Sequence, residues 1–133
     1  RSINPVTGKS YEVDNMSQDD RSALSKIESA KLTSVCFVMD YLALGFDEQG
    51  GLTILSYPIL IVLSEAIENS DLRYRNLLCE LIGHKIESIE IGANESINIV
   101  FDNSWGMKID IRRNDKTGEK VILTGTNNYL YVF

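Results

Sequence analysis

Residues 97–111, "INIVFDNSWGMKIDI", read as two β-strands joined by a turn, and residues 42–56, "LALGFDEQGGLTILS", have the same pattern. In both stretches apolar residues alternate with small or polar ones, which is the period of a strand with one buried face. The first strand ends in Phe-Asp both times, at residues 46–47 and 101–102. Because aspartate hydrogen-bonds the backbone in turns, we expect Asp47 and Asp102 to have structural roles.

The similarity extends towards the N-terminal side of both stretches. When Lys31 is placed over Lys85, the apolar positions that follow coincide, with a one-residue slip, across residues 31–57 and 85–112. Each segment holds three strand-like runs, so we predict two copies of a three-stranded antiparallel meander. We expect the two meanders to form one continuous, strongly bent sheet rather than two facing sheets.

Each predicted meander has one apolar face. These faces carry Val35, Phe37, Leu42, Leu44, Phe46, Leu52 and Ile54 in the first copy, and Ile89, Ile91, Ile97, Ile99, Phe101, Met107, Ile109 and Ile111 in the second. The opposite face of the second copy is polar and suits water. That of the first copy is small or apolar, with Ser34 and Cys36 among its residues, so we expect the helix predicted at 18–29 to cover it.

Two helices and a hairpin complete the predicted fold. Ser17 can cap a short amphipathic helix over residues 18–29. Ser70 can cap a central helix over roughly 71–82, and Gly83 can end it. The apolar stripe of that central helix consists of Leu72, Leu77, Leu78, Leu81 and Ile82, with Tyr74 at its edge. The runs "EKVILTG" and "NNYLYVF" predict a C-terminal hairpin.

The length of 133 residues suits one domain, and the composition is ordinary for a globular protein. Residues 1–16 are polar and contain turn signals, so we expect a loosely ordered N-terminal arm. Residues 17–133 form the predicted single α+β domain.

The formal net charge of −6 disfavours a nucleic-acid-binding protein, which usually has a basic excess. The longest apolar run, "YPILIVL", is too short to span a bilayer, so we expect no membrane association.

No residue pattern indicates catalysis, a cofactor or a metal, and we expect none of the three. His84 follows a helix-ending glycine, which favours capping or simple exposure over catalysis. Cys36 and Cys79 lie in apolar runs, so we expect two buried free thiols, with a structural disulfide as the alternative.

Charge is distributed unevenly along the chain. Residues 40–95 hold ten acidic residues against three basic ones, a net charge of −7. This segment is either an ordinary solvated surface or an acidic docking face for a basic partner. Our candidate partner-binding residues on it are Glu65, Glu68 and Glu87. Trp105, in a predicted turn, either folds back over Phe101 or Met107 or is an exposed binding anchor.

The stretches "VCFVMDYLALGF" (35–46) and "RNLLCELIGHKIESI" (75–89) resemble small bacterial immunity-type proteins of polymorphic-toxin and contact-dependent-inhibition systems. The resemblance covers roughly residues 31–111. It implies a cytoplasmic protein that binds and blocks one cognate toxin. An acidic immunity protein would suit a basic nuclease toxin.

The leading hypothesis is therefore a non-enzymatic binding protein that neutralises a toxin through an acidic surface. The alternative is a structural or regulatory module that self-associates through a sheet edge or through the "YPILIVL" segment. An enzyme is the least favoured class, because the sequence offers no site.

Overall fold

The computed structural model describes residues 18–47, 50–92, 95–111, 120–125 and 129–133, and the predicted arm at 1–16 lies outside them. This part of the chain folds into two helices and ten strands, which confirms the α+β class. The elements are α1 (Gln18–Ser25), β1 (Leu32–Val38), β2 (Tyr41–Phe46), β3 (Gly50–Ile54), β4 (Ile59–Val62), β5 (Glu65–Ile67), α2 (Tyr74–Glu80), β6 (Ile86–Gly92), β7 (Ser96–Phe101), β8 (Gly106–Asp110), β9 (Val121–Thr124) and β10 (Leu130–Val132).

The strands form two antiparallel five-stranded sheets, so the predicted single bent sheet is wrong. The first sheet has the order β1-β2-β3-β9-β10 and the second the order β5-β4-β8-β7-β6. We call β1–β3 the first triplet and β6–β8 the second triplet. The open edge of each triplet is taken by a hairpin from elsewhere in the chain, since β3 pairs with β9 and β8 pairs with β4. The triplets therefore cannot join through these edges.

The two triplets have closely similar pairing. In the first, Leu32 lies opposite Phe46, and the register then shifts so that Ser34 lies opposite Gly45. In the second, Ile86 lies opposite Phe101, and the same shift places Ser88 opposite Val100. The predicted C-terminal hairpin is present, since β9 and β10 pair antiparallel.

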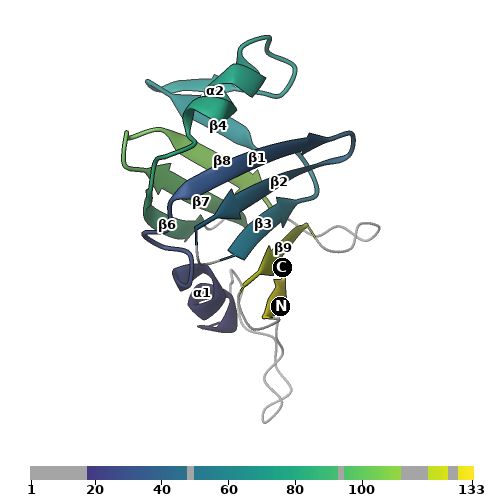
Figure 1. Ribbon diagram of the computed structural model, residues 1–133, viewed down its shortest axis with the longest axis vertical. Helices are drawn as coiled ribbons and strands as arrows, with labels where there is room; N and C mark the ends of the chain where they lie inside the picture. Colours follow the sequence, from purple (N-terminus) through teal and green to yellow (C-terminus); the bar gives the residue numbers. More distant parts are fainter. Residues whose placement is uncertain (1–17, 48–49, 93–94, 112–119, 126–128) are drawn as a thin grey trace.

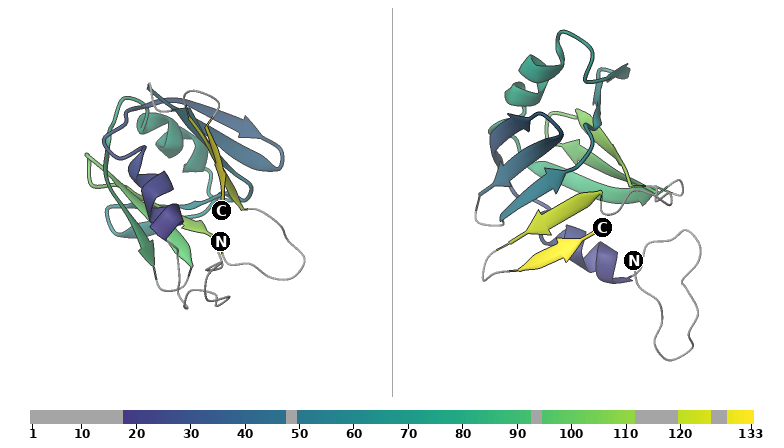
Figure 2. Two further views of the ribbon diagram at one scale, coloured as in Figure 1. Left: turned by 90° about the horizontal axis from the view of Figure 1, so that it is seen from below. Right: turned by 90° about the vertical axis from the view of Figure 1, so that its right-hand side faces the viewer.

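The core lies between the two sheets, which face each other with α2 at one end of the molecule and α1 towards the other (Figures 1 and 2). The predicted apolar faces supply much of it. From Leu42 to Ile54 and from Ile97 to Ile111 their residues are buried, while Val35, Phe37, Ile89 and Ile91 are partly buried against the core. The period-two pattern thus identified the inner faces correctly.

Helix α1 ends at Ser25, earlier than the predicted residue 29, and Ile27 is buried in the turn that follows. As predicted, the helix buries its apolar side, at Ala23 and Leu24. It contacts β6, however, and does not cover the outer face of the first triplet. Ser34 and Cys36 on that outer face are exposed, so the predicted cover is wrong. The apolar side of α1 instead packs against the core at the end of the molecule opposite α2.

Helix α2 begins at Tyr74, later than predicted, because residues before it form turns. The Asp71 carboxylate accepts the Arg73 backbone N–H at 2.8 Å, and the Tyr74 N–H bonds the Asp71 carbonyl at 3.0 Å. The predicted stripe is correct at Leu78 and Leu81 and wrong at Leu72, which is 98% exposed. Tyr74, placed at the edge from sequence, is buried.

The remaining stripe positions divide between core and surface. Leu77 is partly buried, whereas Ile82 is 43% exposed. Helix α2 ends at Glu80 with Leu81 as its C-cap, earlier than predicted. Gly83, two residues after the cap, has a φ of +98°, a left-handed conformation that favours glycine.

The "YPILIVL" segment is an inner strand. β4 pairs with β5 on one side and with β8 on the other, and Leu60 and Val62 point into the core. The backbone edges of β4 are therefore occupied within the chain, while Leu63 at the end of the segment is exposed. In the part of the chain that the structure describes, no helix combines the length and the apolar character needed to cross a membrane.

Candidate functional site

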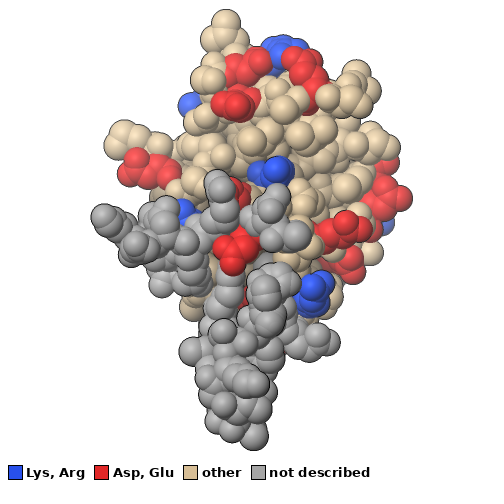
Figure 3. Space-filling view, turned by 180° about the vertical axis from the view of Figure 1, so that it is seen from behind, with Lys and Arg blue, Asp and Glu red and all other residues tan. Residues whose placement is uncertain are grey.

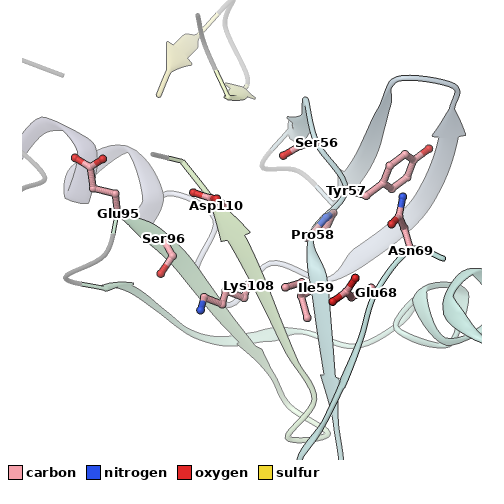
Figure 4. Close-up of a pocket in the computed structure, with 10 residues that line it drawn as sticks. All are labelled: Ser56, Tyr57, Pro58, Ile59, Glu68, Asn69, Glu95, Ser96, Lys108 and Asp110. Atoms are coloured by element: carbon pink, nitrogen blue, oxygen red, sulfur yellow. The ribbon is translucent and has the colours of Figure 1, made fainter. Parts of the chain in front are cut away.

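A cleft of about 660 Å³ opens on the second sheet, where β4 and β8 meet (Figure 4). It is bordered by the start of β4, the residues after β5, the start of β7 and the end of β8. The lining residues are Ser56, Tyr57, Pro58, Ile59, Glu68, Asn69, Glu95, Ser96, Lys108 and Asp110.

The pairing of β8 with β4 and β7 brings together the polar residues on one side of the cleft. Lys108 lies opposite Ile59 on β4, and Asp110 lies opposite Ser96 on β7. Successive side chains of a strand point to opposite faces, so Lys108 and Asp110 share the outer face of the second triplet. Both are exposed, as the alternation predicted for that face, while Ser96 is buried at the base.

Two tyrosines hold the apolar wall of the cleft in place. The Tyr57 hydroxyl donates a hydrogen bond to the Val38 carbonyl at the end of β1, at 2.5 Å. The Tyr74 hydroxyl on α2 donates to the Pro58 carbonyl, also at 2.5 Å, and burial raises the pKa of this phenol well above its usual range. The two rings meet edge to face with centroids 6.2 Å apart. The segment that enters β4 is thus anchored to the first sheet and to α2.

The cleft carries an excess of negative charge. Glu68, Glu95 and Asp110 line it together with one cation, Lys108. Glu68 follows β5 and is exposed, on the wall opposite β8. Such an arrangement favours a cationic group that can pack its alkyl stem against Tyr57 or Ile59 while its charge reaches the carboxylates.

A second group of charges lies beside the cleft, where Arg73 bridges two carboxylates. Its guanidinium donates to Glu65 at 2.7 and 3.3 Å and to Asp71 at 2.8 and 3.0 Å. Hydrogen bonds from Arg73 lower the pKa of the Asp71 carboxyl to about 2 and also lower the pKa of Glu65. The side chains of Arg73 and Glu65 are more than half exposed and that of Asp71 is 29% exposed, so water screens these ion pairs. We therefore expect the network to fix the local geometry and to add little to the stability of the fold.

The structure brings the sequence-predicted residues together only in part. Glu68 lines the cleft, whereas Glu65 is paired with Arg73. Glu87 is exposed on β6, at the opposite edge of the second sheet from β5, four strand spacings or roughly 19 Å away. Trp105 is half-buried and packs against the core, which agrees with the folded-back interpretation.

Several cleft residues had no signal in the sequence. Tyr57 and Asn69 come from separate loops, and Glu95 is one of many carboxylates in the chain. Their proximity depends on the pairing of β4 with β8, which joins residues distant in sequence. Only the polar outer face of β8 could have been placed from the alternation.

The single histidine pairs with one of the two Phe-Asp aspartates. The His84 Nδ1 lies 2.6 Å from an Asp102 carboxylate oxygen, and the other oxygen of that carboxylate accepts the Lys85 N–H at 3.2 Å. The hydrogen bond with His84 is the main cause that lowers the pKa of the Asp102 carboxyl, and the hydrogen bond from the Lys85 N–H lowers this pKa further. In the first triplet the Asp47 carboxylate accepts the Lys31 N–H at 2.9 Å.

The cysteines are not where the sequence placed them. Cys36 and Cys79 are free and exposed, so the prediction of two buried thiols is wrong in its burial. Cys36 lies on the uncovered outer face of β1, and Cys79 lies on the exposed side of α2, away from the buried Tyr74 and Leu78. Within the described residues, no group of three or more His, Cys, Asp or Glu side chains is arranged to hold a metal ion.

Comparison of the chain with protein-family models, with curated proteins and with solved structures finds no match.

Proposed function

We propose that this protein is a non-enzymatic binding protein of the immunity type, which neutralises a basic toxin domain by receiving a cationic side chain in the cleft. The observation that carries the proposal is the cleft itself, with three carboxylates and one ammonium group beside an apolar wall. We also propose that it acts in the cytoplasm and that its partner is a protein.

The size and form of the cleft suit a docking site for side chains. Its volume of about 660 Å³ lies within the range of sites that hold a small molecule or a few side chains. The wall at Tyr57 is fixed by hydrogen bonds from two tyrosines, so little ordering is needed when a partner binds. Negative charge on the rim would speed the approach of a basic protein and orient it.

The residues that receive the partner differ from the predicted set. Glu68 is retained and is joined by Glu95 and Asp110 of the cleft. Reversing Glu65 would break its pairs with Arg73, and Glu87 lies at the far edge of the sheet, so neither is a clean test of this site.

The test is binding to the product of the gene adjacent to the one for this protein, purified as a basic domain. Glu68→Lys should slow association on the order of tenfold at about 0.05 M salt, and the difference should shrink at about 0.5 M salt. Glu90→Lys is the matched control, because Glu90 is exposed on β6 outside the cleft. Equal effects of the two reversals would remove the cleft as the docking site.

The same protein samples also test the alternative function, which is self-association. Light scattering on the protein alone measures its mass. A dimer or larger species, together with no binding to the adjacent gene product, would overturn the immunity proposal and favour pairing through an edge strand such as β1 or β6.

We also propose that residues 18–67 and 74–132 are two copies of one unit, a helix followed by five strands, that exchange their last two strands. Support comes from the shared register shift and from the paired aspartates, which accept N–H groups of Lys31 and Lys85. The hairpin β4–β5 completes the second sheet, and β9–β10 completes the first.

Further support for the duplication lies where the two segments meet. Lys31 and Lys85 form an antiparallel bridge with each other. Around it the hydrogen bonds are reciprocal, from the Leu32 N–H to the His84 carbonyl and from the Ile86 N–H to the Ala30 carbonyl, both at 2.9 Å. Such reciprocity between corresponding residues is what a local two-fold axis produces.

A further inference from the structure

One end of the molecule displays two leucines that the fold leaves in solvent. Leu63 is 87% exposed at the tip of the β4–β5 hairpin, and Leu72 is 98% exposed in the loop before α2. We define the end surface as Leu63, Glu65, Asp71, Leu72 and Arg73. Both segments lie beside α2, at the top of Figure 1.

The fold provides no reason for a leucine at position 63. Leu63 and Ser64 both have positive φ, 52° and 69°, in a two-residue turn between Val62 and Glu65. Turns of this kind favour asparagine and glycine, because other side chains crowd their own backbone in the left-handed region. Leu63 therefore occupies an unfavourable conformation and buries almost no surface in return.

The two leucines are carried by segments that are tied together. Arg73, next to Leu72, donates to Glu65 on the hairpin and to Asp71 in the loop. This bridge holds the hairpin and the loop in one arrangement. A partner that contacts both leucines would therefore meet a surface that is already organised, which lowers the entropic cost of binding.

The charge of the end surface indicates what kind of partner fits. Two carboxylates surround one guanidinium, and Figure 3 shows acidic side chains gathered around a basic one at this end. The surface continues into the cleft, since the Asp71 N–H bonds the carbonyl of Glu68, which lines it. The end surface and the cleft together hold five carboxylates against two cations, Arg73 and Lys108, a net charge of −3. This net charge favours a basic partner over a second copy of the chain, which would present the same negative surface.

We propose that the end surface is a second part of the partner interface, on which Leu63 and Leu72 insert into apolar recesses of the basic protein that occupies the cleft. This inference rests on the proposed function and names the residues that would stabilise the complex once it forms. The cleft carboxylates act on the association rate, and the two leucines act on the dissociation rate.

The test uses the full chain and the purified basic product of the adjacent gene. The double variant Leu63→Asn, Leu72→Asn should raise the Kd roughly tenfold or more, mainly through faster dissociation. Its thermal midpoint should equal or exceed that of the unmodified protein, since asparagine tolerates positive φ and neither leucine is buried. Leu130→Asn is the matched control, at a leucine that is 60% exposed on β10 of the other sheet.

The outcomes separate this inference from the function it rests on. An unchanged dissociation rate in the double variant, with Glu68→Lys still impaired, would overturn the end surface and leave the cleft proposal intact. An equal loss in the Leu130→Asn control would also overturn it, because the effect would then not belong to this end. No binding by the unmodified protein would overturn both proposals.

Discussion

The first and second triplets have nearly the same strand pairing, but the residues on their outer faces differ. Both contain the same register shift, and in both an aspartate accepts a backbone N–H near the point where the sheets meet. The outer face of the first triplet has small or apolar residues such as Cys36 and Ala43, while that of the second has Lys108 and Asp110 at the cleft. Residues that both triplets need serve the fold, so the residues in which they differ are the better candidates for function.

The largest expected effect tests whether the two helices are equivalent in the core. Leu78 on α2 and Leu24 on α1 are both buried. Leu78→Ala and Leu24→Ala should each lower the free energy of unfolding by about 2–5 kcal/mol, through lost transfer energy and the cavity left behind. Urea unfolding of the two variants measures this. A cost below about 1 kcal/mol for either variant would show that its helix does not seal the core.

A smaller effect should distinguish two glycines at corresponding positions of the triplets. A methyl group at Gly51 would lie 2.9 Å from the Leu44 carbonyl oxygen, whereas at Gly106 its nearest neighbour would be 3.5 Å away. Gly51→Ala should cost about 1–3 kcal/mol by overpacking. Gly106→Ala should be neutral or slightly stabilising, by up to about 1 kcal/mol, because alanine restricts the unfolded chain.

The same unfolding measurements check this pair of variants. Equal destabilisation by the two alanines would mean that the backbones of the triplets approach their neighbours equally closely. The tighter packing that we infer around Gly51 of β3 than around Gly106 of β8 would then be wrong.

The smallest effect concerns the aspartate that has the histidine partner. Bonding to His84 and to the Lys85 N–H lowers the pKa of Asp102 below its ordinary 3.8, so its ionised form stabilises the fold above that pH. The stability that it adds is lost as pH falls through 3.8 and below. The difference in thermal midpoint between the unmodified protein and Asp102→Asn should therefore be greatest near neutral pH and should close in acid.

Asp47→Asn is the control for this prediction, because Asp47 accepts the corresponding N–H and Ala30 stands where the second half has His84. Near neutral pH we expect the Asp102 change to cost more than the Asp47 change. If the two variants cost the same, the His84 pair adds nothing to the fold.

The sequence was informative where burial alone decides the structure. Alternation identified the inner residues of both triplets, from Leu42 to Ile54 and from Ile97 to Ile111, because a strand with one buried face has a period of two. It could not show that β4 pairs with β8 rather than β3. That choice depends on contacts between segments distant in sequence, and it decides between one sheet and two.

The errors at the surface have local causes. Asp71 and Arg73 hold the turn before α2 through side-chain hydrogen bonds, so the helix starts late and Leu72 leaves the stripe. Only Glu68 of the four predicted binding residues lies in the cleft. The excess of carboxylates in residues 40–95 indicated an acidic surface, but charge counts hold no information about which carboxylates are already paired.

The most direct test of the account is hydrogen–deuterium exchange of the protein, free and bound to the basic product of the adjacent gene. We expect binding to slow exchange in residues 56–59, 63–65, 68–73, 95–96 and 108–110, which form the cleft and the end surface. Exchange on the outer face of the first triplet, around Cys36 and Ala43, should not change. Slowing confined to the first triplet would contradict the assignment of function to the residues in which the two triplets differ.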